Sequence, residues 1–99
     1  MKLFKEHELR EAYQFAEDGG QALHMFSNPG LYPNAPNCFK RSNRAAHLFD
    51  QDVIRLQRTA KSLGVTRIVV GCPGTHKQHI DLCGGPLHRA IRQCPKETQ

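Results

Sequence analysis

The densest group of reactive side chains in this 99-residue chain lies between residues 71 and 85. The segment reads Gly-Cys-Pro-Gly-Thr-His-Lys-Gln-His-Ile-Asp-Leu-Cys-Gly-Gly, so two cysteines, two histidines, a lysine and an aspartate stand among turn-forming residues. Three kinds of chemistry fit this composition. They are anion binding, metal binding and acid–base catalysis.

Anion binding is favoured by the glycines and the lysine, because a glycine-rich turn can direct backbone N–H groups and an ammonium at a phosphate. The start of a helix at Gly84-Gly85-Pro86 would add further free N–H donors. We therefore expect a cationic cleft for a phosphate-bearing small molecule. Its expected ligand-binding residues are Arg44, His47, Gly74, Thr75, His76, Lys77, His79 and Arg89.

Two sets of residues could hold a metal ion, and zinc is the cofactor that they allow; in the anion-binding interpretation no cofactor is expected. One set combines two thiols with two imidazoles, the composition of a structural zinc site, although no Cys-x-x-Cys pair is present. The other combines two imidazoles with a carboxylate and leaves coordination positions open for chemistry. The sets are Cys72, His76, His79 and Cys83, and His47, His79 and Asp81.

Acid–base catalysis would use His79 and Asp81, which project to the same side of an extended segment. The carboxylate could then orient the imidazole and stabilise its charged form. The thiol of Cys72 could serve as a nucleophile. These three residues are the expected catalytic set if the protein is an enzyme, but the lack of a stronger constellation favours binding over turnover.

The elements that must position these residues are indicated by apolar spacing and by turn residues. Helices are expected over residues 6–18, from an N-cap at Asp50 through Ser62, and from Pro86 to about Cys94. Strands are expected over residues 21–27 and 66–71, and over 45–49 unless that segment only leads into the next helix. The core-poor stretches 28–44 and 72–85 are expected to be long functional loops, and residues 95–99 a frayed tail.

This alternation predicts a single small α/β domain, a sandwich with about three helices and a partly parallel sheet of two to three strands. If residues 45–49 and 66–71 are both strands, the helix between them makes a right-handed crossover and the strands are parallel. Their carboxyl ends would then bring His47 beside the loop that follows Gly71, as in open α/β sheets that bind ligands there. Homo-oligomers are also expected, because so small a sheet leaves edges to cover.

Composition and charge limit the partners. The net charge is +5, distributed as −2 over residues 1–37, +5 over 38–68 and +2 over 69–99, which predicts an anionic partner. No apolar run approaches the roughly 20 residues of a membrane span, and the first residues lack the apolar stretch of a secretory signal. We therefore expect an intracellular, cytoplasmic protein whose four cysteines are reduced or bind metal, rather than forming two disulfides.

From Ala46 onward the chain resembles a family of short bacterial and phage-encoded proteins that contain a domain of unknown function. The shared motifs are His47-Leu48 before an acidic helix start, Ala60-x-x-Leu-Gly64, His79-Ile80-Asp81-Leu82 and Arg89-Ala90. The resemblance covers about 45 residues and implies that His47, His79, Asp81 and Arg89 are grouped in space. The resemblance is compatible with a phage-encoded protein, in which case the protein would act in the host cytoplasm.

Three hypotheses of function follow. The first is a protein that sequesters or senses a nucleotide or a nucleotide-derived signal. The second is a metal-dependent hydrolase or nuclease that uses His47, His79 and Asp81. The third is an interaction protein that inhibits a host factor through the 28–37 loop, or that binds nucleic acid through the basic residues 39–44.

Overall fold

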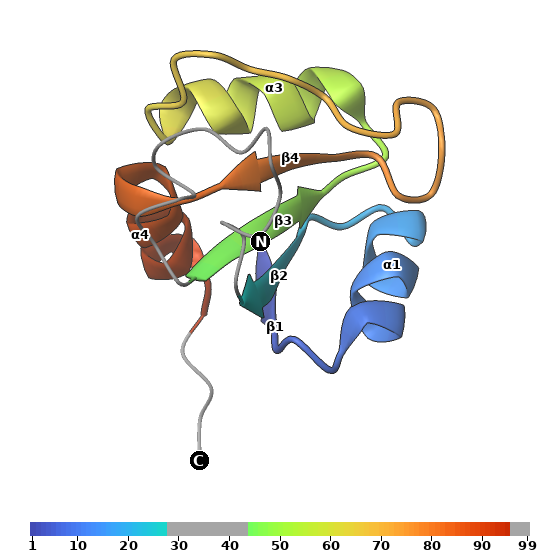
Figure 1. Ribbon diagram of the computed structural model, residues 1–99. Coiled ribbons are helices and arrows are strands. Elements are labelled where there is room, and N and C mark those ends of the chain that lie inside the picture. The colour runs from blue at the N-terminus through green and yellow to red at the C-terminus, as the bar shows by residue number, and fades with distance from the viewer. Residues whose placement is uncertain (28–43, 96–99) are drawn as a thin grey trace.

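The computed structural model describes residues 1–27 and 44–95, in which three helices accompany one four-stranded sheet (Figure 1). The elements in chain order are β1 (Lys2–Phe4), α1 (Leu9–Glu17), β2 (Ala22–Ser27), β3 (Arg44–Phe49), α3 (Val53–Ser62), β4 (His79–Leu82) and α4 (Gly84–Gln93). The sheet is mixed, with β1 and β2 parallel and the other neighbours antiparallel. The fold is therefore α/β with a partly parallel sheet, as predicted, but with four strands instead of two or three.

The strands lie in the order β1-β2-β3-β4, so each strand pairs with its neighbour in sequence. The register places Phe4 opposite His24, His24 opposite His47, and His47 opposite Asp81. Side chains at directly opposed positions point to the same face of a sheet. These four side chains therefore form one row across the whole sheet.

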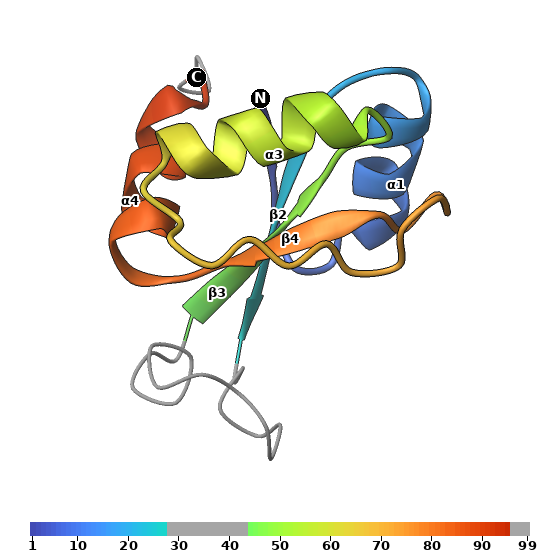
Figure 2. The ribbon, with the colours of Figure 1, turned by 90° about the horizontal axis from the view of Figure 1, so that it is seen from above.

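The two faces of the sheet are covered by different helices (Figure 2). Helices α3 and α4 pack on the face that carries Leu23, Leu48, Ile80 and Leu82, and there they form the larger apolar core. Helix α1 packs on the other face through Ala12 and Ala16, whose small side chains meet the aromatic and alanine residues Phe4, Ala22 and Phe49. The row of Phe4, His24, His47 and Asp81 lies on the face of the sheet that α1 covers.

The strand expected over residues 66–71 does not form, and the parallel pairing with residues 45–49 is therefore wrong. Only Gly71 pairs, through an isolated antiparallel bridge to His79. Ile68 and Val70 pack against the larger core, whereas Val69 is largely exposed. The β-branched residues of this segment thus fill the rim of the core, and their strand preference reflects packing more than backbone pairing.

Two short strands were not expected, β1 at the start of the chain and β4 within the presumed loop 72–85. In β4 the buried Ile80 and Leu82 alternate with the polar His79 and Asp81, which is the pattern of a strand with one apolar face. Four residues are enough here because β3 supplies the pairing partner and α3 and α4 the core.

The helices begin and end within a few residues of their predicted bounds. The N-cap of α3 is Asp52, whose carboxylate accepts a hydrogen bond from the backbone N–H of Arg55, and not Asp50. Asp50 is instead fully buried between β3 and α3, where it accepts hydrogen bonds from Arg55, from Gln21 and from the backbone N–H of Asp52.

Gln78 connects this buried carboxylate residue to the loop that precedes β4. Its amide Nε2 donates to the carbonyl of Asp50 at 2.8 Å, and its Oε1 accepts from the backbone N–H of Gly74 at 2.9 Å. The side chain of Gln78 is itself buried. Residues 72–78 are therefore held against the end of β3, and the position where β4 begins is set by these bonds.

The expected loop over residues 28–44 and the expected tail over 95–99 lie mostly outside the described residues, which include only Arg44 and Pro95 of them. Among the helices of the described ranges, none has the length and apolar character to cross a membrane.

Candidate functional site

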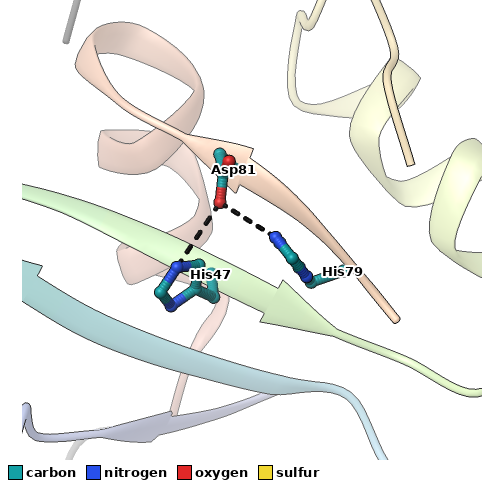
Figure 3. Close-up of side chains that lie close together, drawn as sticks. All are labelled: His47, His79 and Asp81. Atoms are coloured by element: carbon teal, nitrogen blue, oxygen red, sulfur yellow. Dashed lines mark ion pairs between the residues drawn. The ribbon is translucent and has the colours of Figure 1, made fainter. Parts of the chain in front are cut away.

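Three side chains from the two strands β3 and β4 converge on one face of the sheet (Figure 3). His47 is contributed by β3, and His79 and Asp81 are contributed by β4. One ligand atom from each lies within 4.8 Å of those of the other two, and this is the only such group among the residues that the structure describes. The structure thus brings together one of the two metal-ligand sets predicted from the sequence.

Asp81 is the centre of the group. Its Oδ1 lies 3.4 Å from Nε2 of His79 and 3.6 Å from Nε2 of His47. The side chain of Asp81 is 49% exposed, whereas those of His47 and His79 are 28% and 18% exposed. The two imidazoles are therefore held within the sheet face, and solvent reaches the group from the side of the carboxylate.

The orientation of His79 is set by the backbone that precedes it. Its Nδ1 lies 2.7 Å from the carbonyl oxygen of Lys77. A carbonyl oxygen can only accept a hydrogen bond, so Nδ1 carries the hydrogen and, in the neutral ring, Nε2 carries the lone pair. That lone pair faces Asp81.

Gly71 makes room for the ring of His79. A Cβ atom at residue 71 would stand 2.6 Å from Cε1 and 2.8 Å from Nε2 of His79. The bridge between the two residues brings their backbones together, with hydrogen bonds of 2.8 and 3.1 Å. Glycine at residue 71 thus allows the imidazole to lie across the neighbouring backbone with its Nε2 toward Asp81.

The ring of His47 is enclosed by aromatic neighbours. Phe26 stacks on it at 4.2 Å between ring centroids, and Phe49 and His79 contact it at 5.3 and 5.0 Å. On the side away from Asp81, its Nδ1 lies 3.4 Å from Nδ1 of the buried His24. These contacts leave Nε2 as the ring atom that faces the carboxylate.

Burial determines the charge of this group. Desolvation, with smaller contributions from His79 and His24, lowers the pKa of His47 to about 3, so its ring is neutral at physiological pH. Desolvation also raises the pKa of Asp81, an effect that His79 opposes. A neutral imidazole is the form that binds a metal ion.

The residues expected to bind phosphate are arranged differently. The backbone N–H of Gly74 donates to Gln78, that of Thr75 to the carbonyl of Cys72, and that of Lys77 to the hydroxyl of Thr75. The glycine-rich turn therefore uses these donors for its own hydrogen bonds. It does not direct them toward His47 and His79.

The two arginines of that set lie away from the histidines. Arg89 donates to the carbonyl of Leu63 at 2.9 Å and packs beside Gly64 and Gly85, on the side of the sheet that α3 and α4 cover. Arg44 lies three residues before His47 in β3, so its side chain points to the opposite face of the sheet. The grouping of Arg89 with His47, His79 and Asp81 that the family resemblance implied is not observed.

His76 and Lys77 lie beside α1. The ring of His76 meets the ring of Tyr13 edge to face at 5.5 Å, and the ammonium of Lys77 lies 5.9 Å from the same ring. Burial, with a smaller contribution from Cys72, raises the pKa of Tyr13. This cluster is joined to the histidine site through Phe49, which contacts both Tyr13 and His79.

The four-ligand zinc set is not assembled, since Cys72, His76, His79 and Cys83 are all described and bring no three ligand atoms together. Cys83 is disulfide-bonded, which removes its thiolate from coordination. The prediction of reduced thiols therefore holds for Cys72 and Cys94 but not for Cys83. Cys72 is exposed, has a positive φ of 49° and, within the described part of the chain, does not belong to the group that His79 and Asp81 form.

His24, Gly71 and Phe26 were not predicted as part of the site. The alternation of His24 with Leu23 and Met25 does indicate that it faces away from the larger core. Its position beside His47 depends on the register between β2 and β3, which are far apart in the sequence, so spacing along the chain does not predict it.

Comparisons of the chain with models of known families, with curated proteins and with solved structures found no match.

Proposed function

We propose that this protein binds a divalent metal ion through Nε2 of His47, Nε2 of His79 and a carboxylate oxygen of Asp81, and that it is a metal-dependent hydrolase. The observation that carries this proposal is the approach of two imidazole nitrogens to a single oxygen of Asp81, at 3.4 and 3.6 Å. Two imidazoles and one carboxylate form a ligand set known from catalytic metal sites.

The two separations between Asp81 Oδ1 and the imidazole nitrogens favour tetrahedral coordination. Ligands about 2.1 Å from a zinc ion lie about 3.4 Å apart at the tetrahedral angle and about 3.0 Å apart at a right angle. The separations at Asp81 are closer to the first value. Zinc is therefore the ion that we propose, and three protein ligands leave one position for water.

The partners of the histidines support the same proposal. Histidines that bind a metal nearly always donate the other ring N–H to a carbonyl, a carboxylate or water. His79 does this through Lys77, so that in the neutral ring Nε2 presents its lone pair beside the carboxylate. Without a cation or proton between them, the lone pair and the carboxylate oxygen repel each other.

Bound zinc would lower the pKa of its water to about 7 and so supply a hydroxide nucleophile for hydrolysis. The chain's own residues hold His47 neutral and both imidazoles in place, and they leave the carboxylate side open to a substrate. The net charge of +5 and the nearby Lys77 favour an anionic ester, such as a phosphoester, as the substrate.

The metal content of protein purified without a metal-affinity tag or a chelator tests the first part of the proposal. We expect one equivalent of zinc per chain in the wild type and none in Asp81→Asn. His76→Ala is the matched control, because it removes an imidazole that lies just before β4 and is not in the ligand set. This variant should retain the metal.

Hydrolysis of bis(4-nitrophenyl) phosphate by the zinc-loaded protein tests the second part. We expect release of nitrophenolate by the wild type and by His76→Ala, and none by Asp81→Asn. A wild type that holds zinc but releases no more product than zinc-free protein would contradict the hydrolase function and leave the metal site standing.

The anion-binding function predicted first from the sequence receives less support from the geometry, because the donors of the turn are used internally and the arginines lie elsewhere. It stays a prediction, as do the predicted oligomer, the interaction with a host factor and the binding of nucleic acid.

A further inference from the structure

His24 is the buried histidine that no predicted site includes. It lies in the centre of β2, is 3% exposed, and stands in the row between Phe4 and His47. Both of its ring nitrogens have a partner at hydrogen-bond distance. Nε2 lies 2.9 Å from the carbonyl oxygen of Glu6, and Nδ1 lies 3.4 Å from Nδ1 of His47.

The carbonyl of Glu6 determines which nitrogen of His24 carries the hydrogen. A carbonyl oxygen can only accept, so Nε2 of His24 is the donor, and in the neutral ring its Nδ1 bears the lone pair. Nδ1 of His47 must then donate to that lone pair. The result is that Nε2 of His47 also bears a lone pair, directed at Asp81.

We propose that His24 is a positioning residue of the metal site, which holds His47 in the tautomer that presents Nε2 to the metal. This inference rests on the proposed function. With this role for His24, the tautomer of each histidine ligand is selected by a backbone carbonyl. The carbonyl of Lys77 acts on His79 directly, and that of Glu6 acts on His47 through His24.

The turn that carries this carbonyl is itself attached to β2. The carboxylate of Glu6 accepts hydrogen bonds from the backbone N–H of Ser27 at 2.9 Å and from its hydroxyl at 3.3 Å. Residue 6 is thus held over the strand that contains His24. The ring of His24 is also parallel to that of His47, with an angle of 4° between the planes.

Without His24, the other tautomer of His47 would be preferred when no metal is bound. Oδ1 of Asp81, 3.6 Å away, would be the acceptor that remains, and a proton on Nε2 would relieve its repulsion from the ring nitrogen. The nitrogen needed for the metal would then carry a hydrogen. Loss of such outer partners typically weakens metal binding by about 10–100-fold.

The test compares His24→Phe, which keeps an aromatic ring but has no acceptor, with His24→Asn, whose amide oxygen can take the place of Nδ1. Long-range ¹H–¹⁵N spectra of the metal-free proteins report the tautomer of His47, and titration with Co²⁺ reports the affinity. His88→Phe, an exposed histidine on α4, is the matched control.

We expect the wild type, His24→Asn and His88→Phe to hold His47 with hydrogen on Nδ1. In His24→Phe we expect hydrogen on Nε2 and an affinity for Co²⁺ about 10–100-fold lower. If His24→Phe keeps the wild-type tautomer, or if both substitutions weaken Co²⁺ binding equally, His24 acts only through packing and the inference is overturned. A wild type that binds no Co²⁺ refutes the proposed function, while the tautomers still decide whether His24 positions His47.

Discussion

Two aspartates lie close to the paired strands β3 and β4, and their surroundings are opposite in kind. Asp50, just after β3, is fully buried and accepts hydrogen bonds from Arg55, Gln21 and the backbone N–H of Asp52. Asp81, in β4, is half exposed, and imidazole nitrogens of His79 and His47 lie 3.4 and 3.6 Å from its Oδ1. The first carboxylate is surrounded by donors, and the second faces two imidazole nitrogens that are acceptors when their rings are neutral.

This difference separates a structural role from a functional one. A buried carboxylate with several donors stabilises the folded chain, because its charge is compensated where it lies. A carboxylate beside two neutral imidazoles, whose lone pairs face it, gains nothing from them unless a metal ion or a proton lies between the three groups. We therefore predict that Asp50 contributes to stability but not to metal binding. Asp81 should contribute to metal binding but not to stability.

The largest expected effect is on metal binding in Asp81→Asn. The amide removes the anionic ligand, so we expect the affinity for zinc to fall by more than about 100-fold, beyond the loss caused by removing an outer partner. The free energy of unfolding of the metal-free protein should be unchanged or higher, because the repulsion at the site is relieved. Competition with a chromogenic chelator and urea unfolding measure the two quantities. Weaker folding with full zinc affinity would show that Asp81 is structural.

Asp50→Asn should give the reverse result. The amide replaces an acceptor of charge-assisted hydrogen bonds with a donor group that faces Arg55, so we expect the free energy of unfolding to fall by about 2–3 kcal/mol. The exposed side of Arg55 limits the loss, since the guanidinium can be solvated. Zinc affinity of the folded protein should stay within about twofold of wild type. Loss of zinc under conditions where circular dichroism shows the native fold would contradict a purely structural role of Asp50.

Gly71→Ala should affect the site without affecting the core. The new methyl group would stand 2.6 Å from the ring of His79, so the imidazole must turn away from Asp81. We expect about tenfold weaker zinc binding, the lower end of what displacement of an oriented ligand costs.

Gly74→Ala is the control for that substitution. Gly74 has a positive φ of 77° and no atom within 4 Å of an added Cβ, so alanine there costs about 1 kcal/mol of stability without touching His79. Equal zinc affinities of the two alanine variants would contradict the role of Gly71.

The smallest expected effect concerns pH. The pKa of His47 is lowered to about 3 in the folded state from about 6.5 in the unfolded state, so below pH 6.5 the unfolded chain binds a proton that the folded chain does not. The stability from this residue is complete above pH 6.5 and is lost as the pH falls toward 3. Between pH 7.5 and 5.5, the metal-free wild type should therefore lose about 1.4 kcal/mol more of unfolding free energy than His47→Gln. Urea denaturation at each pH measures these free energies. If they fall by the same amount in the two proteins, His47 is not held neutral.

Much of the fold could be predicted because its helices have clear apolar spacing and stops. Periodicity predicts an apolar stripe of Val53, Leu56, Ala60 and Leu63 before Gly64, and the last three of these are buried in the larger core, whereas Val53 is exposed. The strand at residues 66–71 was wrong because β-branched residues also suit the rim of a core. β4 was missed because its four residues lie within a glycine-rich, polar stretch, where alternation over so short a length is a weak signal.

The site was partly predictable for a simple reason. His79 and Asp81 are two residues apart in an extended segment, so their shared side does not depend on how the sheet is built. His47 joined the hypothesis through a parallel pairing that does not exist, and it lies there through an antiparallel one instead. The roles of Gly71 and His24, and the absence of Arg89 from the site, depend on register and on contacts across the sheet. A pattern along the chain does not contain this information.

The central claim is that Nε2 of His47 and Nε2 of His79 face Asp81 as a metal site. Long-range ¹H–¹⁵N spectra recorded during addition of one equivalent of zinc test it most directly. We expect the Nε2 signals of His47 and His79 to shift together with one-to-one stoichiometry, while both Nδ1 atoms keep their hydrogens and the signals of His7 and His88 stay in place. Unchanged Nε2 signals of His47 and His79, or shifts at the exposed histidines alone, would contradict it.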